Sequence, residues 1–128
     1  MKYFTIKELC KTNRALPNVP DKQVEANLAE LIINVLDPLR EIYGRPIRVN
    51  SGYRSPLVNA AVGGAKNSDH LYGMAADITT GSKSDNALLF KLIRDNFTFK
   101  QLICEHNYQW VHVSYNSKNN KKQILFIN

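Results

Sequence analysis

Apolar residues recur every three or four positions in parts of the chain, which is the spacing of an amphipathic helix. The longest such stretch runs from Asp21 to about Tyr43 and carries one apolar stripe: Val24, Leu28, Leu31, Ile32, Val35, Leu36, Leu39 and Ile42. We expect Pro38 to bend or interrupt this helix and Gly44 to end it. Shorter helices are expected over three further ranges: residues 4–11, 55–62 and 85–96.

Shorter runs rich in apolar residues predict strands, mostly in the last third of the chain. The expected strands cover residues 46–51, 75–79, 100–105, 110–115 and 122–127. We interpret the last three as antiparallel, with a turn at 106–109, and we expect the polar segment 65–74 to be a loop. Helices followed by a small antiparallel sheet predict an α+β fold, with the N-terminal helices packed on the sheet. One domain over residues 1–128 suits this length.

Composition is that of an ordinary globular protein, with 44% hydrophobic and 22% charged residues. The net charge of +6 is compatible with nucleic acid, an anionic membrane or an anionic wall polymer. Because the basic residues are scattered and no nucleic-acid recognition motif is present, we expect no nucleic-acid partner. No stretch approaches the roughly 20 apolar residues of a membrane span. The first residues lack a signal-peptide pattern, so we expect synthesis in the cytoplasm. Cys10 and Cys104 are expected to be reduced thiols.

Three polar residues, far apart in the sequence, form a candidate metal site. His70, Asp77 and His112 make a set of two histidines and one carboxylate, which is typical of catalytic zinc with one open position. Asp77 lies within the apolar strand expected at 75–79, where a carboxylate is costly unless it is paired or bound to metal. Alternation places His112 on the face opposite its two valine neighbours. Each residue also has an ordinary structural interpretation, so the spacing alone leaves both readings open.

Four short motifs follow one another along the chain. They are SGYRSPLVN at 51–59, VGG at 62–64, SDHLYGMAAD at 68–77 and WVHVS at 110–114. Together they resemble the zinc D-alanyl-D-alanine carboxypeptidase family (peptidase M15 type, with the hedgehog/DD-peptidase fold), and most closely its small phage-like and Bacteroides-like members. The resemblance covers residues 30–115. It implies one zinc ion per chain, held by His70, Asp77 and His112, and hydrolysis of a peptide by metal-activated water.

The resemblance also implies which side chains contact the substrate. Arg54 matches the arginine that binds the substrate carboxylate or the developing oxyanion in relatives, and its planar fork of donors suits either task. Ser68 would contact the substrate beside the metal loop. We expect Tyr53 and Trp110 to line the groove for the peptide.

The catalytic base departs from the pattern of this family. Many relatives carry an acidic residue three positions before the last histidine ligand, where this chain has Gln109. A carboxamide does not accept a proton usefully, so Glu105 is the candidate base. We expect Glu105 to lie across the hairpin from Trp110, within reach of the metal site. An exposed charge at the hairpin end is its structural alternative.

Two functions follow as hypotheses. The first is a metallopeptidase that cleaves peptidoglycan stem peptides, as a D-Ala-D-Ala carboxypeptidase or an L-Ala-D-Glu endopeptidase. The second is a non-catalytic, zinc-containing module that binds the cell wall or a protein, which the departure at Gln109 keeps open. For the first we expect a monomer, made in a bacterial or phage-infected cytoplasm and acting on the wall as endolysin-like enzymes do. The bond cleaved, the native metal and the choice between lysis and remodelling stay open.

Overall fold

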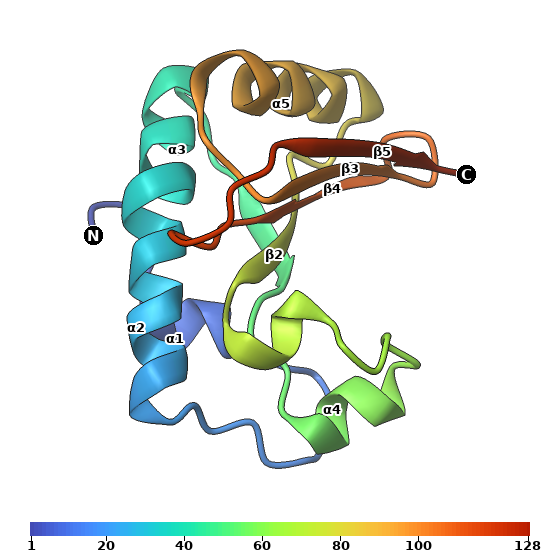
Figure 1. Cartoon of the computed structure of the whole chain (residues 1–128). Coiled ribbons are helices and arrows are strands. Elements are labelled where there is room, and N and C mark those ends of the chain that lie inside the picture. The colour runs from blue at the N-terminus through green and yellow to red at the C-terminus, as the bar shows by residue number, and fades with distance from the viewer.

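One helical column runs along one side of the molecule (Figure 1). In this computed structural model, which describes residues 1–128, the column consists of α2 (Lys22–Leu31), the π-helical segment η1 (Ile32–Leu36) and α3 (Asp37–Tyr43). The column begins where the Asp21 carboxylate accepts the backbone N–H of Val24. It ends at Gly44, whose φ of 82° is a left-handed conformation that glycine adopts without strain.

The proline inside this column changes its pitch without breaking it. Pro38 has no N–H to donate, and its ring leaves little room for the preceding turn. The helix widens just before it, where the N–H of Asp37 donates to the carbonyl of Ile32, five residues back. The predicted long helix is therefore confirmed, and its irregularity takes the form of a π-helical turn.

The remaining helices are short except for the one that crosses the top of the view in Figure 1. They are α1 (Ile6–Leu9), α4 (Pro56–Ala61) and α5 (Lys83–Asn96). Thr5, Ser55 and Ser82 cap them, because each side chain accepts a backbone N–H of the first turn. The segment 65–74, predicted as a loop, contains the 3-10 helix η2 (Asp69–Tyr72). That prediction was therefore wrong for the part of the segment that carries His70.

The sheet has five strands in the order β1-β2-β4-β3-β5. Their bounds are β1 (Arg48–Ser51), β2 (Ala75–Thr79), β3 (Gln101–Glu105), β4 (Trp110–Ser114) and β5 (Gln123–Ile127). The pairs β1–β2, β2–β4 and β3–β4 are antiparallel, as expected for most of the sheet. All five predicted strands are present within a residue or two of their predicted bounds.

The last strand corrects the prediction of a wholly antiparallel sheet. β5 pairs with β3 in parallel. The chain leaves β4 and passes the end of the sheet, and the N–H groups of Lys122 and Gln123 donate to the carbonyls of Phe99 and Lys100. β5 therefore starts beside the start of β3, on its far side from β4. The alternation of apolar and polar residues does not distinguish a parallel from an antiparallel last strand, since it carries no information on which strand lies beside it.

The core lies between the sheet and the helices. α5 packs on β3 and β4, while α3 packs on α5. The fully buried side chains include Leu28, Leu36, Leu89, Val111 and Val113. Because the two valines of β4 point into this core, His112 between them faces the opposite side of the sheet. The fold is thus α+β, as predicted. No helix has both the length and the apolar character that crossing a membrane requires.

Candidate metal centre

Pairing of β2 with β4 brings two of the predicted ligands face to face. Asp77 lies directly opposite His112 in the register, and the His112 Nδ1 is 3.0 Å from the Asp77 Oδ1. The third residue, His70, comes from η2, and its Nε2 lies 3.4 Å from the same carboxylate oxygen. The candidate ligand atoms of the three residues all lie within 4.8 Å of one another. The structure therefore gathers into one cluster the three residues that the sequence singled out.

Local sequence explains how η2 presents His70. The Ser68 hydroxyl accepts the backbone N–H of His70 at 3.2 Å, which starts the short helix. Gly73 ends it with a φ of 71°, so the chain turns back toward β2 without strain. A side chain at Gly73 would also meet the carbonyl oxygen of Val24 at 2.8 Å. The turn that carries His70 is thus fixed closely against α2.

A backbone carbonyl orients the His70 ring. The His70 Nδ1 lies 2.7 Å from the carbonyl oxygen of Gly52, which can only accept a hydrogen bond. We therefore assign one ring proton to Nδ1, so that Nε2, which faces Asp77, is the nitrogen available to bind a metal ion. His112 turns the other ring nitrogen, Nδ1, toward the carboxylate. Gly52 itself has no room for a side chain, because a Cβ would lie 2.2 Å from the carbonyl oxygen of Leu9.

The electrostatics of the cluster favour a cation. His70 is 2% exposed and His112 is 8% exposed, and no lysine or arginine forms an ion pair with Asp77. Burial acts to raise the pKa of Asp77, but the hydrogen bonds to His112 and His70 outweigh it and hold that pKa well below its usual range. An ionised carboxylate and two imidazoles are nitrogen and oxygen donors that suit zinc. The residues present therefore fit the predicted metal.

The cluster faces a hollow of about 550 Å³. Its lining also includes Arg54, Ser68, Glu105, His106 and Trp110. Glu105 lies opposite Trp110 in the β3–β4 register, as predicted. The ring centroids of His106 and Trp110 lie 4.9 Å apart, with the two ring planes tilted by 48°. The hollow thus brings a carboxylate and a guanidinium to the same space as the candidate ligands.

Two charged groups of this hollow are partly buried. Burial raises the pKa of Glu105, and the negative charge of Asp77 raises it further. Burial lowers the pKa of Arg54. The guanidinium donates to the Ser68 hydroxyl at 3.3 Å, while its Nε–H is buried with no acceptor in the protein. A cation held in this way favours an anionic partner.

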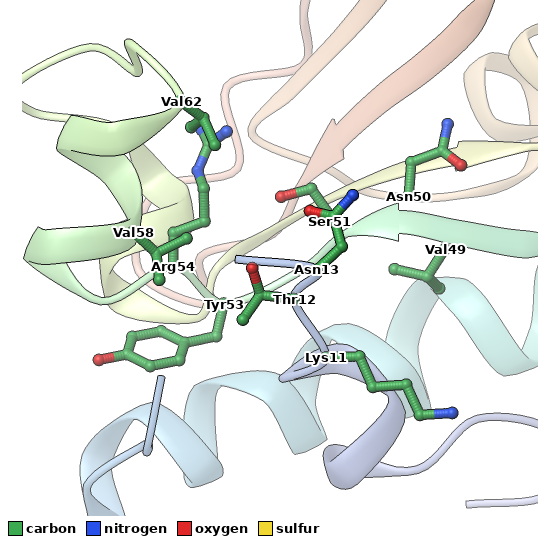
Figure 2. A pocket seen from close by; sticks show the side chains of 10 residues that line it. All are labelled: Lys11, Thr12, Asn13, Val49, Asn50, Ser51, Tyr53, Arg54, Val58 and Val62. Carbon is green, nitrogen blue, oxygen red and sulfur yellow. The ribbon is translucent and has the colours of Figure 1, made fainter. Parts of the chain in front are cut away.

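Tyr53 is the one predicted site residue that lies elsewhere. Its side chain is 7% exposed and belongs to the hydrophobic core, and it does not border the metal hollow. Its N–H donates to the carbonyl of Leu9, which draws this part of the chain against the N-terminal segment. Figure 2 shows its ring directed away from the neighbouring Arg54 guanidinium. Tyr53 instead lines a second hollow beside this one, so its contact with the peptide stays a prediction.

The sequence did not indicate two features that position the ligands. One is the carbonyl of Gly52, which accepts a hydrogen bond from the His70 ring. The glycine inside the SGYRSP motif was the one sign in the sequence that the backbone is closely packed at this position. The other is an ion pair between Lys100 and Asp69, at 2.8 Å, which joins the ligand turn to the sheet. No pattern along the chain relates two residues so far apart.

Comparison with known proteins agrees with this geometry. The model of a family described as Peptidase M15 matches residues 2–114. This chain belongs to the peptidase M15 family. One curated relative, the zinc D-Ala-D-Ala carboxypeptidase of Streptomyces albus G, is 39% identical over 98 residues, which are 74% of this chain and 38% of the relative. The chain thus spans well under half of that relative's length. The predicted family is confirmed, and the predicted zinc cofactor agrees with the relative's name and with the donor set.

Proposed function

We propose that the chain is a zinc-dependent peptidase that hydrolyses peptidoglycan stem peptides. The observation that carries the proposal is a single hollow lined by the His70–Asp77–His112 donor set together with Arg54 and Glu105. Cleavage at a terminal D-Ala-D-Ala bond is the first candidate, since the relative carries that activity in its name. Cleavage at an L-Ala-D-Glu bond is the second. Action at the cell wall, as one domain over residues 1–128 and as a monomer, completes the proposal.

The chemistry divides between the metal and the side chains of the chain. When bound, zinc activates water for attack and polarises the scissile carbonyl. Glu105 takes a proton from the attacking water and passes it to the leaving amine. The raised pKa of Glu105 lies nearer to neutral pH than that of an ordinary glutamate, which suits a group that both accepts and donates a proton. Arg54 binds the substrate carboxylate or the developing oxyanion, and Ser68 and Trp110 border the bound peptide.

A zinc-containing binding module on the same fold is the alternative. Gln109 supports it, because this position carries no acid and its side chain is exposed outside the metal hollow. The two functions differ in what Glu105 does. In a peptidase it moves a proton, whereas in a binding module it is one polar group among several.

Two measurements test the proposal, one of metal content and one of turnover. Metal content is measured on the native protein and on His112→Ala, and we expect about one zinc per native chain and a large loss in the variant. Turnover of a D-Ala-D-Ala peptide is then compared for Glu105→Gln and for Glu25→Gln, an exposed glutamate on α2. We expect the first to keep zinc and lose activity by a factor of about 10²–10⁴, and the second to change neither.

The outcomes are distinct. Full turnover in Glu105→Gln would show that another group acts as the base. Zinc binding without cleavage of either type of stem peptide by the native protein would favour the binding module. A native protein that takes up no zinc would remove the metal chemistry altogether.

A further inference from the structure

A second hollow has a volume of about 470 Å³, and Figure 2 shows the side chains that line it. It adjoins the metal hollow, because Arg54 and Val62 line both of them. The far wall of the second hollow is the segment that follows α1, with Lys11, Thr12 and Asn13, and its floor is the end of β1. Its volume falls within the roughly 300–1,000 Å³ range of sites that hold small ligands. A ligand that reaches past Arg54 from the metal would therefore enter this space.

The same stretch of backbone builds both hollows. The carbonyl of Gly52 accepts the Nδ1–H of the ligand His70, and the next N–H, of Tyr53, donates to the carbonyl of Leu9 at 2.7 Å. The Asn18 amide donates to the carbonyls of Cys10 and Tyr53, both at 2.9 Å. The segment that carries Lys11 and Asn13 is thus held at a fixed distance from the metal ligands.

The two hollows differ in charge. The metal hollow is lined by three carboxylates, those of Asp69, Asp77 and Glu105. The second is lined by two cations, Lys11 and Arg54, and by no carboxylate. Its other polar groups are hydroxyls and amides, from Thr12, Asn13, Asn50 and Ser51. Figure 2 shows Thr12 and Asn13 between Arg54 and Lys11. Such a lining favours an anion with hydrogen-bonding groups beside it.

We propose that this second hollow is a substrate subsite for an acidic residue on the leaving-group side of the scissile bond. The inference rests on the proposed peptidase function, in which Arg54 lies beside the residue that leaves. In a longer leaving group this residue has no free carboxylate, and the Arg54 guanidinium donates to its peptide carbonyl instead. A peptide that continues past Arg54 places its next residue against Asn13 and Ser51, and the carboxylate of that residue near Lys11. The chain thereby accepts a leaving group longer than one amino acid and prefers an acidic one.

Matched leaving groups test the subsite. Three stem peptides are compared, identical up to the scissile bond and followed by D-alanine, D-alanyl-D-glutamate or D-alanyl-D-glutamine. We expect kcat/KM to favour the glutamate over its neutral isostere about fivefold, the upper range for a partly exposed charge pair. In Lys11→Glu and in Asn13→Asp this ratio should fall to about one or below. Lys91→Glu, the same charge change on the exposed side of α5, should keep the native ratio.

Binding keeps this test independent of turnover. Titration calorimetry measures the dipeptides D-alanyl-D-glutamate and D-alanyl-D-glutamine with the zinc-loaded protein and the same variants. Preferential binding of the acidic dipeptide that is lost in Lys11→Glu supports the subsite, even if no stem peptide is cleaved and the proposed function fails. Equal binding and equal cleavage of the two isosteres overturns the subsite while the peptidase stands. A preference that survives both variants also overturns it, since the selectivity then lies outside this hollow.

Discussion

An ion pair between the sheet and the metal-ligand turn offers a sharp test of how the site is held. The Lys100 Nζ lies 2.8 Å from the Asp69 Oδ1, and the two side chains are 21% and 14% exposed. Asp69 opens η2 and directly precedes His70. Lys100→Met keeps the aliphatic stem and removes the charge, which leaves the Asp69 carboxylate largely buried without its partner.

The burial of this ion pair determines how much free energy of unfolding the variant loses. Exposed pairs contribute about 0.2–1 kcal/mol, whereas breaking a buried pair costs about 3–5 kcal/mol. At this intermediate exposure we expect Lys100→Met to lower the free energy of unfolding by about 1–3 kcal/mol. For a domain of this size, each kcal/mol corresponds to a fall in Tm of roughly 3–5 °C. Zinc affinity should fall as well, because the turn that orients His70 is less well held.

A double-mutant cycle isolates this interaction. Urea unfolding of the metal-free protein is measured for Lys100→Met, Asp69→Asn and the double variant, and we expect a coupling energy of about 1–2 kcal/mol. The pair Arg94–Asp95 is the matched control, with a similar distance of 2.9 Å but side chains that are 44% and 47% exposed. Its cycle, from Arg94→Met and Asp95→Asn, should give less than about 0.5 kcal/mol. Equal coupling energies in the two cycles would refute the reasoning from burial.

Three further results are expected. Gly52→Ala should destabilise the protein by at least about 2 kcal/mol and weaken zinc binding, because its Cβ would overlap the Leu9 carbonyl oxygen, and a variant with unchanged Tm would contradict this. Burial raises the pKa of Glu105 in the metal-free fold, so ionisation of this side chain lowers the free energy of unfolding. This loss of stability is absent below the unfolded pKa of about 4.3 and develops as the pH rises through the folded pKa. Urea unfolding should therefore show that Glu105→Gln stabilises the metal-free protein at neutral pH and not near pH 3, and equal differences at both pH values would exclude that cause. Zinc in excess should raise Tm, and a chelator should reverse the rise.

Local patterns in the sequence account for most of the elements and for the separation of core from site. The apolar stripe predicts the long helix, and alternation in β4 correctly places His112 opposite two buried valines. The caps that Thr5, Asp21 and Ser55 form are local as well, because each side chain accepts a backbone N–H only three residues further along the chain. The motif resemblance then favoured His70, Asp77 and His112 as metal ligands, which their spacing alone left undecided, and the structure brings these three candidates together.

Features that depend on which segments become neighbours were not predictable in this way. The parallel pairing of β5 with β3 follows from the path of residues 115–122 around the sheet, which no periodicity encodes. Tyr53 was expected to line the peptide groove, and its side chain is largely buried and borders the second hollow instead of the metal hollow. The Lys100–Asp69 pair joins residues 31 positions apart. Each of these features depends on contacts between segments far apart in the sequence, which the residues next to it do not determine.

The ligand cluster is a product of the fold, and this determines how the metal experiments are to be interpreted. β2 and β4 are adjacent although α5 and β3 lie between them in the sequence, and their pairing alone sets Asp77 against His112. None of the three ligands belongs to the core cluster of 21 buried residues. Small domains that fold only with their metal lack such a core. A chain with this core should stay folded when zinc is removed or when His112 becomes alanine. Loss of zinc in that variant would then report on the ligand itself and not on unfolding.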